Sequence, residues 1–171
     1  MNISNKDSMP TVLSLISNTH TLTAAQPDKL LMDQQQAFDI VSQHLWKSLH
    51  NEDPPQLLMQ VHGKGGTGKS KLIQTITAHF TNLGVEDWLV KFAYTSIAAS
   101  LIGGETTHQV GRSSVNGRHM GSATKSRLEG FWKKPWYLII DEVSMISQKC
   151  FANLSRNIAA AKISNTVCNH L

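Results

Sequence analysis

The sequence predicts an α/β fold in which a parallel sheet carries helices on both faces. Short apolar segments at 57–61, 88–94 and 136–140 alternate with helical or polar stretches, and a glycine-rich loop follows the first of them directly. Strands joined through helices pair in parallel, and both faces of such a sheet are then covered. The length of 171 residues, 40% of them apolar, is enough for one domain with a substantial core.

The N-terminal half divides at residue 28. Residues 1–28 are rich in Ser, Asn and Thr without a sustained period, and are expected to be a disordered tail. From Asp33, a candidate N-cap, apolar residues recur at helical spacing, and the sequence HNEDPP at 50–55 ends that helix. Residues 57–61 (LLMQV) are typical of a short buried strand. Residues 69–83 are again periodic, and Gly84 is suited to the position after a helix C-terminus.

The C-terminal half continues the alternation. Residues 88–94 (WLVKFAY) predict a second strand, and 96–101 (SIAASL) a short helix closed by two glycines. Residues 109–130 are polar and basic with little periodicity. Residues 136–140 (WYLII) predict a third strand, which ends at Asp141 and Glu142, and 147–162 predict a helix.

The positive charge of the chain is concentrated in one segment. The whole chain has 16 Lys and Arg against 12 Asp and Glu, a net charge of +4, while residues 111–135 alone have six basic residues and one acidic residue. Such a segment is ordinarily a solvated loop, but it also suits phosphate contacts with a nucleic acid. Trp132 and Trp136 flank two of its lysines, which leaves base stacking open, although Trp136 is expected in the core.

Cysteine content and hydropathy exclude several classes of protein. Cys150 and Cys168 form no CxxC pair, so neither a disulfide framework nor a zinc site is expected. No segment approaches the run of about 18 apolar residues that a membrane span needs. We therefore expect a soluble intracellular protein with no membrane partner.

The glycine-rich loop matches GxxxxGK[ST], the phosphate-binding P-loop. Several backbone N–H groups must converge on a phosphate chain, and glycine permits so tight a turn. The motif predicts that Lys69 reaches the β and γ phosphates of ATP and that the Ser70 hydroxyl binds Mg²⁺. A merely flexible turn is disfavoured because the loop lies between a predicted strand and a helix. The nucleotide-binding residues are Gly63, Gly65, Gly66, Thr67, Gly68, Lys69 and Ser70.

Two acidic residues follow the third predicted strand. In parallel α/β sheets, ligands bind at the carboxyl ends of the strands. Asp141 would there hold Mg²⁺ through water, and Glu142 would orient and deprotonate the attacking water. With Lys69 they form the candidate catalytic set. Taken alone, two acids after an apolar strand more often cap a helix, but their position 72 residues after Lys69 in the same predicted sheet favours a catalytic role.

Four ordered blocks between about 32 and 158 resemble the petite-integration-frequency family of DNA helicases. These blocks are LLMDQQQAF at 30–38, GGTGKS at 65–70, AYTSIAASLIGGETTH at 93–108 and LIIDEVSMIS at 138–147. The family consists of 5′-to-3′ helicases of superfamily one with RecA-like lobes. The resemblance implies ATP as substrate, Mg²⁺ as cofactor, and single-stranded DNA or a forked duplex as partner. It further implies a nuclear or mitochondrial location and roles in DNA repair, recombination and telomere maintenance.

The same resemblance assigns further residues by position. It makes Gln34 similar to the glutamine that reads adenine upstream of the P-loop. Thr95 and Ser96 fall in a block that contacts the DNA backbone in the family, as do Thr106 and His108 in the IxGxTxH segment that begins at Ile102. Ser96 stands where the family usually has glycine, so a close approach to DNA is in doubt there. His108 also suits a purely structural, hydrogen-bonded role.

The family pattern extends beyond the blocks found here. In the family, the Asp–Glu strand is followed by a Gly-Asp segment with a phosphate-sensing glutamine, and later by a second lobe with an arginine finger. We find neither in this sequence. We therefore expect residues 29–162 to be a partial first RecA-like lobe without its central strand, followed by an unrelated tail at 163–171. The alternative is a non-catalytic fragment that binds ATP and DNA. An unrelated P-loop ATPase or kinase is disfavoured, because such proteins lack the THQV and DEVSMIS blocks.

Overall fold

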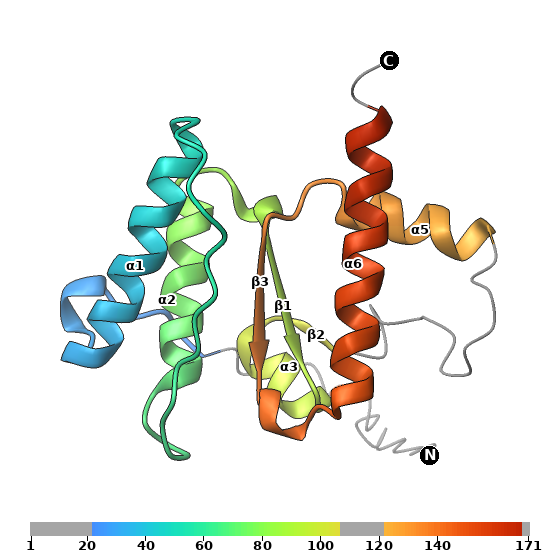
Figure 1. Cartoon of the computed structure of the whole chain (residues 1–171). Coiled ribbons are helices and arrows are strands. Elements are labelled where there is room, and N and C mark those ends of the chain that lie inside the picture. Colours follow the sequence, from blue (N-terminus) through green and yellow to red (C-terminus); the bar gives the residue numbers. More distant parts are fainter. Residues whose placement is uncertain (1–21, 107–121, 169–171) are drawn as a thin grey trace, which may run out of the picture.

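The computed structural model describes residues 22–106 and 122–168, and within them it contains a three-stranded parallel sheet. The strands are β1 (Leu89–Ala93), β2 (Glu105–Thr106) and β3 (Tyr137–Asp141), in the order β2-β1-β3. The pairing of β1 with β3 runs from Leu89 opposite Tyr137 to Ala93 opposite Asp141. Figure 1 shows both strands ending at the same lower edge of the molecule. The predicted α/β class with a parallel sheet is confirmed.

One face of the sheet is covered by helices from the first half of the chain. These are α1 (Met32–Leu49), α2 (Lys69–Asn82) and α3 (Ser96–Ile102). The apolar stripes of α1 and α2 meet in a cluster around Leu45 and Phe80, against which Leu89, Tyr137 and Ile139 pack from the strands. Because strand side chains alternate, the even-numbered residues of the same strands face the other way.

The opposite face is covered by α5 (Ser122–Trp132) and α6 (Gln148–Cys168). Phe92 lies at the centre of this second cluster, which also contains Trp132 of α5 and Leu154 of α6, with Leu138 and Ile140 packed against it. Figure 1 shows α6 running alongside the sheet, with α5 crossing behind it. Short 3-10 turns at Pro27–Lys29, Glu86–Trp88 and Val143–Met145 complete the described elements.

Most helix boundaries follow the sequence signals. Helix α1 ends at Leu49 before the HNEDPP segment, and α2 ends at Asn82, where Gly84 has a φ of +70° and its N–H donates to Thr81 O. Helix α1 begins at Met32, and its N-cap is Leu31 rather than the predicted Asp33. At this end of the helix the Gln34 side chain accepts a hydrogen bond from the Leu31 N–H. Residues 22–28 belong to the segment expected to be a disordered tail, yet they make hydrogen bonds to the rest of the chain. One of these runs from the Ala25 N–H to Thr75 Oγ1 at 3.0 Å.

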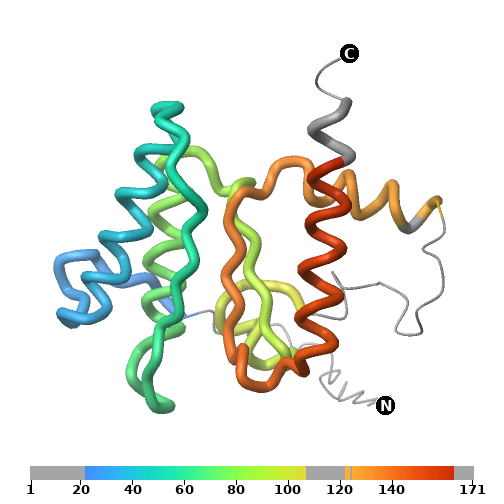
Figure 2. The backbone as a smooth tube through the Cα atoms, in the orientation of Figure 1, coloured from blue at the N-terminus to red at the C-terminus, as the bar shows by residue number. Residues whose placement is uncertain are grey.

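The predicted strand at 57–61 is wrong. These residues run as an extended segment beside α2 without ladder partners (Figure 2), and Leu58 is 82% exposed. A strand needs a neighbouring backbone for its N–H and C=O groups. The family resemblance puts a further strand between this segment and the Asp–Glu strand, and no residue of 22–106 or 122–168 lies there as a strand.

The basic segment contains a helix that its weak periodicity did not predict. Only Leu128 and Trp132 of α5 are buried among its described side chains, so the apolar pattern is too sparse to register in the sequence. The expected core position of Trp136 is also wrong. Trp132 is 2% exposed, whereas Trp136 is 66% exposed and stacks on Trp88 with ring centroids 5.1 Å apart.

A hydrogen-bonded group links α1 to β3. The Tyr137 hydroxyl lies 2.8 Å from His44 Nδ1 and 3.0 Å from Ser48 Oγ, and His44 Nε2 lies 2.9 Å from the Pro55 carbonyl oxygen. Burial raises the pKa of Tyr137, while the hydrogen bond to Ser48 opposes that shift.

The described helices include none with the length and hydropathy to cross a membrane.

The close approach of β2 to β1 predicts that Gly104→Ala destabilises the fold. A Cβ at Gly104 would lie 2.7 Å from the carbonyl oxygen of Lys91, so the backbone of one strand must shift. We expect a loss of about 1–3 kcal/mol in the free energy of unfolding, measured by urea denaturation. Gly130→Ala is the matched control, because a Cβ there would meet no atom within 4 Å apart from its chain neighbours and the backbone of its own helix. That change removes a glycine from a helix and should stabilise by about 0.5–1 kcal/mol. Equal effects of the two substitutions would contradict the close approach.

Candidate functional site

The glycine-rich loop at 63–68 turns sharply from the extended segment into α2. Gly66 and Gly68 have φ values of +79° and +82°, in the left-handed region that side chains avoid. Gly68 is the N-cap of α2, so the first turn of that helix begins directly at Lys69 and Ser70. The N–H groups of that turn and the positive end of the helix dipole form an anion-binding terminus. Two left-handed glycines followed at once by a helix are compatible with the motif, and phosphate binding there stays a prediction.

Hydrogen bonds within the loop hold the Lys69 side chain. Its Nζ donates to Gly63 O at 2.7 Å and to Lys64 O at 2.9 Å, and the Thr67 hydroxyl donates to Lys64 O at 2.8 Å. The ammonium group thus lies against the backbone of its own loop. The Lys64 carbonyl, which the sequence did not single out, accepts from both side chains. Backbone acceptors carry no residue-type signal, so only the spacing of the motif points to it.

Gln34 of α1 contacts the loop from the other side. Its Nε2 donates to Thr67 O at 2.8 Å, and its Oε1 accepts from the Leu31 N–H at 3.2 Å. A Cβ at Gly68 would lie 2.7 Å from Gln34 Nε2 and would displace the end of that side chain, while the φ of +82° itself favours glycine. The glutamine expected to read adenine is therefore held beside the P-loop, although the two lie 33 residues apart in the sequence.

The acidic pair lies where β3 ends. Asp141 is the last residue of β3, and its Oδ1 accepts the N–H of Glu142 at 2.9 Å. Glu142 has a φ of +53°, an uncommon conformation for a residue with a side chain. Its Oε2 accepts a hydrogen bond of 3.3 Å from the hydroxyl of Thr95, which is also the N-cap of α3. The structure thus brings Thr95 and Glu142 together across the ends of two neighbouring strands.

Packing orients α2 toward the same edge of the sheet. Ile73, one turn beyond Lys69, lies in a buried cluster with Ala93 at the end of β1, and Ile139 packs against that cluster. Because Ala93 pairs with Asp141, the cluster ties the start of α2 to the strand that carries the acidic pair. Figure 1 shows the loop before α2, the ends of β1 and β3 and the start of α3 at the same end of the molecule.

The remaining predicted site residues are less closely grouped. Ser96 is exposed at the start of α3, and Thr106 is the last residue of β2. Lys125 pairs with Glu129 within α5 at 3.7 Å, and Arg127 is exposed. His108, Arg112 and Arg118 lie outside the described residues. No hydrogen bond between Ser70 and Asp141 is found among the described residues, so their joint role at a metal stays a prediction.

The oxygen donors available at this edge suit Mg²⁺. Ser70 offers a hydroxyl and Asp141 a carboxylate, and Mg²⁺ is usually held by one or two such groups together with substrate phosphates and water. The described residues contain no cluster of three or more His, Cys, Asp or Glu side chains that would hold a metal without a substrate.

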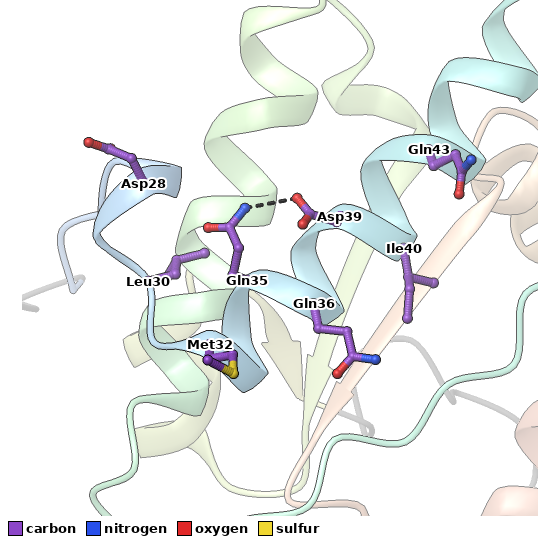
Figure 3. A pocket seen from close by; sticks show the side chains of 8 residues that line it. All are labelled: Asp28, Leu30, Met32, Gln35, Gln36, Asp39, Ile40 and Gln43. Carbon is purple, nitrogen blue, oxygen red and sulfur yellow. Dashed lines mark hydrogen bonds between the residues drawn. The ribbon is translucent and has the colours of Figure 1, made fainter.

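The hollow in Figure 3 is separate from this edge. It has a volume of about 650 Å³ and lies on the outer face of α1, where Gln35 donates to Asp39 at 2.8 Å. Its lining contains two carboxylates and no Lys or Arg, so it does not suit a polyphosphate. The lining residues are Asp28, Leu30, Met32, Gln35, Gln36, Asp39, Ile40 and Gln43.

Comparison with known proteins agrees with the sequence blocks. A model of the PIF1-like helicase family matches residues 29–168. The chain is also similar to the ATP-dependent DNA helicase RRM3 of Saccharomyces cerevisiae, with 27% identity over 141 residues. That match covers 80% of this chain and 18% of the yeast protein, so the chain spans less than a fifth of the length of that relative. No solved structure matches the chain.

The position of Lys69 predicts that its removal weakens nucleotide binding. Lys69→Ala deletes a charge-assisted contact worth about 1.5–3 kcal/mol, or roughly 10- to 150-fold in Kd for a fluorescent ATP analogue with Mg²⁺. Lys71→Ala removes the same charge from an exposed position two residues further along the helix and should leave the Kd within about twofold. Equal affinities of wild type and Lys69→Ala would exclude this site.

Proposed function

This chain belongs to the PIF1-like helicase family, and from that membership we propose that it binds ATP with Mg²⁺ and acts on DNA as the first motor lobe of an ATP-dependent DNA helicase. The observation that supports the proposal most strongly is the P-loop itself. Its lysine ammonium lies against the carbonyls of its own loop, at the start of α2, and Ile73 of that helix packs with Ala93 and Ile139 of the strands.

The nucleotide would be held by the loop, by α2 and by Gln34. The N–H groups at the start of α2 would bind the phosphates, and Lys69 would turn from the carbonyls of Gly63 and Lys64 toward the β and γ phosphates. Gln34 touches the loop backbone at Thr67 and has a carboxamide whose donor and acceptor match the edge of adenine. We therefore propose ATP rather than an unspecified nucleotide as the ligand.

The acidic pair would carry out hydrolysis. Ser70 and Asp141 would hold Mg²⁺, which neutralises charge on the phosphates when bound. The Glu142 carboxylate would orient a water molecule for attack on the γ phosphorus and accept its proton. Both acids lie where β3 ends, the edge at which parallel sheets of this kind bind their ligands.

DNA would bind at the ends of β1 and β2 and along the basic segment. The hydroxyls of Thr95, Ser96 and Thr106 are suited to phosphate oxygens, as is His108 by its family position. We propose 5′-to-3′ movement along single-stranded DNA, with roles in repair, recombination and telomere maintenance in the nucleus or mitochondrion, on the basis of the family resemblance. Residues 29–162, which carry the family blocks, would form a partial first lobe.

The proposed hydrolysis predicts a separation of binding from turnover in Glu142→Gln. The amide keeps the size of the carboxylate but cannot accept the proton, so the rate of ATP hydrolysis should fall by about 10²–10⁴. The affinity for the fluorescent ATP analogue should stay within about threefold, because the nucleotide is held by the P-loop. Phosphate release is measured with and without oligothymidylate.

Three results of that experiment discriminate between functions. Oligothymidylate-stimulated phosphate release that Glu142→Gln abolishes supports a motor lobe. ATP binding without phosphate release in the wild type favours a non-catalytic ATP- and DNA-binding module. Equal hydrolysis by wild type and Glu142→Gln would reject the assignment of Glu142.

The basic helix α5 predicts a salt-dependent affinity for single-stranded DNA. If Lys125 and Arg127 each neutralise one phosphate, replacing both by Ala should reduce the log–log slope of affinity against salt by up to about 1.4, at about 0.7 per contact. Lys29→Ala with Lys47→Ala removes the same charge from η2 and α1 and should leave the slope unchanged. An unchanged slope in the α5 variant would indicate that these residues form only a solvated face.

A further inference from the structure

We propose that Thr95 is a positioning residue for Glu142, and that a DNA phosphate bound at Thr95 releases the Glu142 carboxylate by competing for the same hydroxyl. This inference rests on the proposed function, since it takes Thr95 as a DNA contact and Glu142 as the group that orients water. It adds a direct contact between the two residues, which lie 47 positions apart in the sequence.

The hydroxyl of Thr95 has two partners. It donates to Glu142 Oε2 at 3.3 Å and accepts the N–H of Ala98 at 3.2 Å, which caps α3. A hydroxyl has one proton to donate and two lone pairs to accept with. Donation to Glu142 and donation to a DNA phosphate therefore exclude each other, whereas the cap on α3 is compatible with either.

The Glu142 carboxylate depends on that donation for its position. Within 22–106 and 122–168, Thr95 is the only side chain found to donate to it, and Glu142 is otherwise exposed. The backbone of Glu142 is fixed independently by its left-handed φ of +53° and by the bond from its N–H to Asp141 Oδ1. Freeing the side chain would therefore redirect the carboxylate without moving the strand end.

The register of the sheet makes the contact accessible to DNA. Ala93 pairs with Asp141, so the chain leaves β1 and β3 side by side, and Thr95 and Glu142 follow within two residues. Thr95 is half-buried at this edge, with the exposed Tyr94 and Ser96 on either side. A phosphate oxygen that reaches this edge from solvent can accept the hydrogen bond of the Thr95 hydroxyl in place of Glu142. Without DNA the carboxylate is held by Thr95, and with DNA it is free to orient water.

The first experiment tests the contact without DNA or ATP. The side-chain carboxyl ¹³C resonance of Glu142, assigned through its loss in Glu142→Gln, is compared at fixed pH in wild type, Thr95→Val and Thr95→Ser. We expect the resonance to shift in Thr95→Val and to keep its wild-type position in Thr95→Ser, which retains the hydroxyl. Thr81→Val is the matched control, because among the described residues the Thr81 hydroxyl bonds within α2, to Thr77 O. The backbone amide of Ala98 reports separately on the cap of α3.

The second experiment adds DNA. Oligothymidylate is titrated to saturation, with its binding followed by the anisotropy of a fluorescent label. We expect the Glu142 resonance of the wild type to move in the direction seen in Thr95→Val, and we expect DNA to leave that of Thr95→Val unchanged. The wild-type titration stands even if Thr95→Val fails to fold.

The outcomes that overturn the inference differ from those that overturn the proposed function. An unshifted Glu142 resonance in folded Thr95→Val rejects the positioning role. Oligothymidylate that binds without moving the wild-type resonance rejects the competition while leaving DNA binding intact. No rise in anisotropy overturns the DNA contact and the competition together, and the DNA-free comparison then reports on the hydrogen bond alone.

Discussion

Five residues of β1 pair in parallel with five residues of β3, and this ladder positions both the core and the candidate site. It places Ala93 opposite Asp141, so that the two chains leave the sheet at the same edge. The helix that follows β1 begins at Ser96 and the acidic pair follows β3, which brings side chains from distant parts of the sequence within hydrogen-bonding distance. A shift of one residue in this register would turn each side chain of β3 to the opposite face.

The alternation of side chains along these two strands separates the molecule into two packed layers. Leu89 and Ile139 face α1 and α2, while Phe92 and Ile140 face α5 and α6. Phe92 is fully buried, with its ring edge-on to Trp132 at a centroid distance of 6.1 Å. The same two strands therefore join α1 and α2, which flank the glycine-rich loop in the sequence, to α5 and α6 on the other face.

The P-loop keeps its shape through contacts of its own. Lys69 and the Thr67 hydroxyl bond to loop carbonyls, and Gln34 bonds to Thr67 O from α1. These bonds fix the loop although the segment before it, 57–61, pairs with no strand within 22–106 and 122–168. An incoming phosphate chain would exchange contacts with a loop that is already curved, which reduces the entropy lost on binding.

Local chemistry in the sequence determined most of the helices, the strands β1 and β3 and the shape of the glycine-rich loop. Glycine at 66 and 68, lysine at 69 and two acids after an apolar strand act through their spacing in the sequence, so they can be recognised without a structure.

Tertiary structure alone decided the features that depend on contacts with other segments. Residues 57–61 have strand-like composition but pair with no strand of the described part of the chain, and α5 forms a helix with only two buried anchors among its described side chains. Trp136 lies exposed instead of in the expected core for the same reason. The contact between Thr95 and Glu142 exists only because β1 and β3 are adjacent. Hydrophobicity reports what a side chain prefers, whereas pairing and burial depend on which other segments the fold brings beside it.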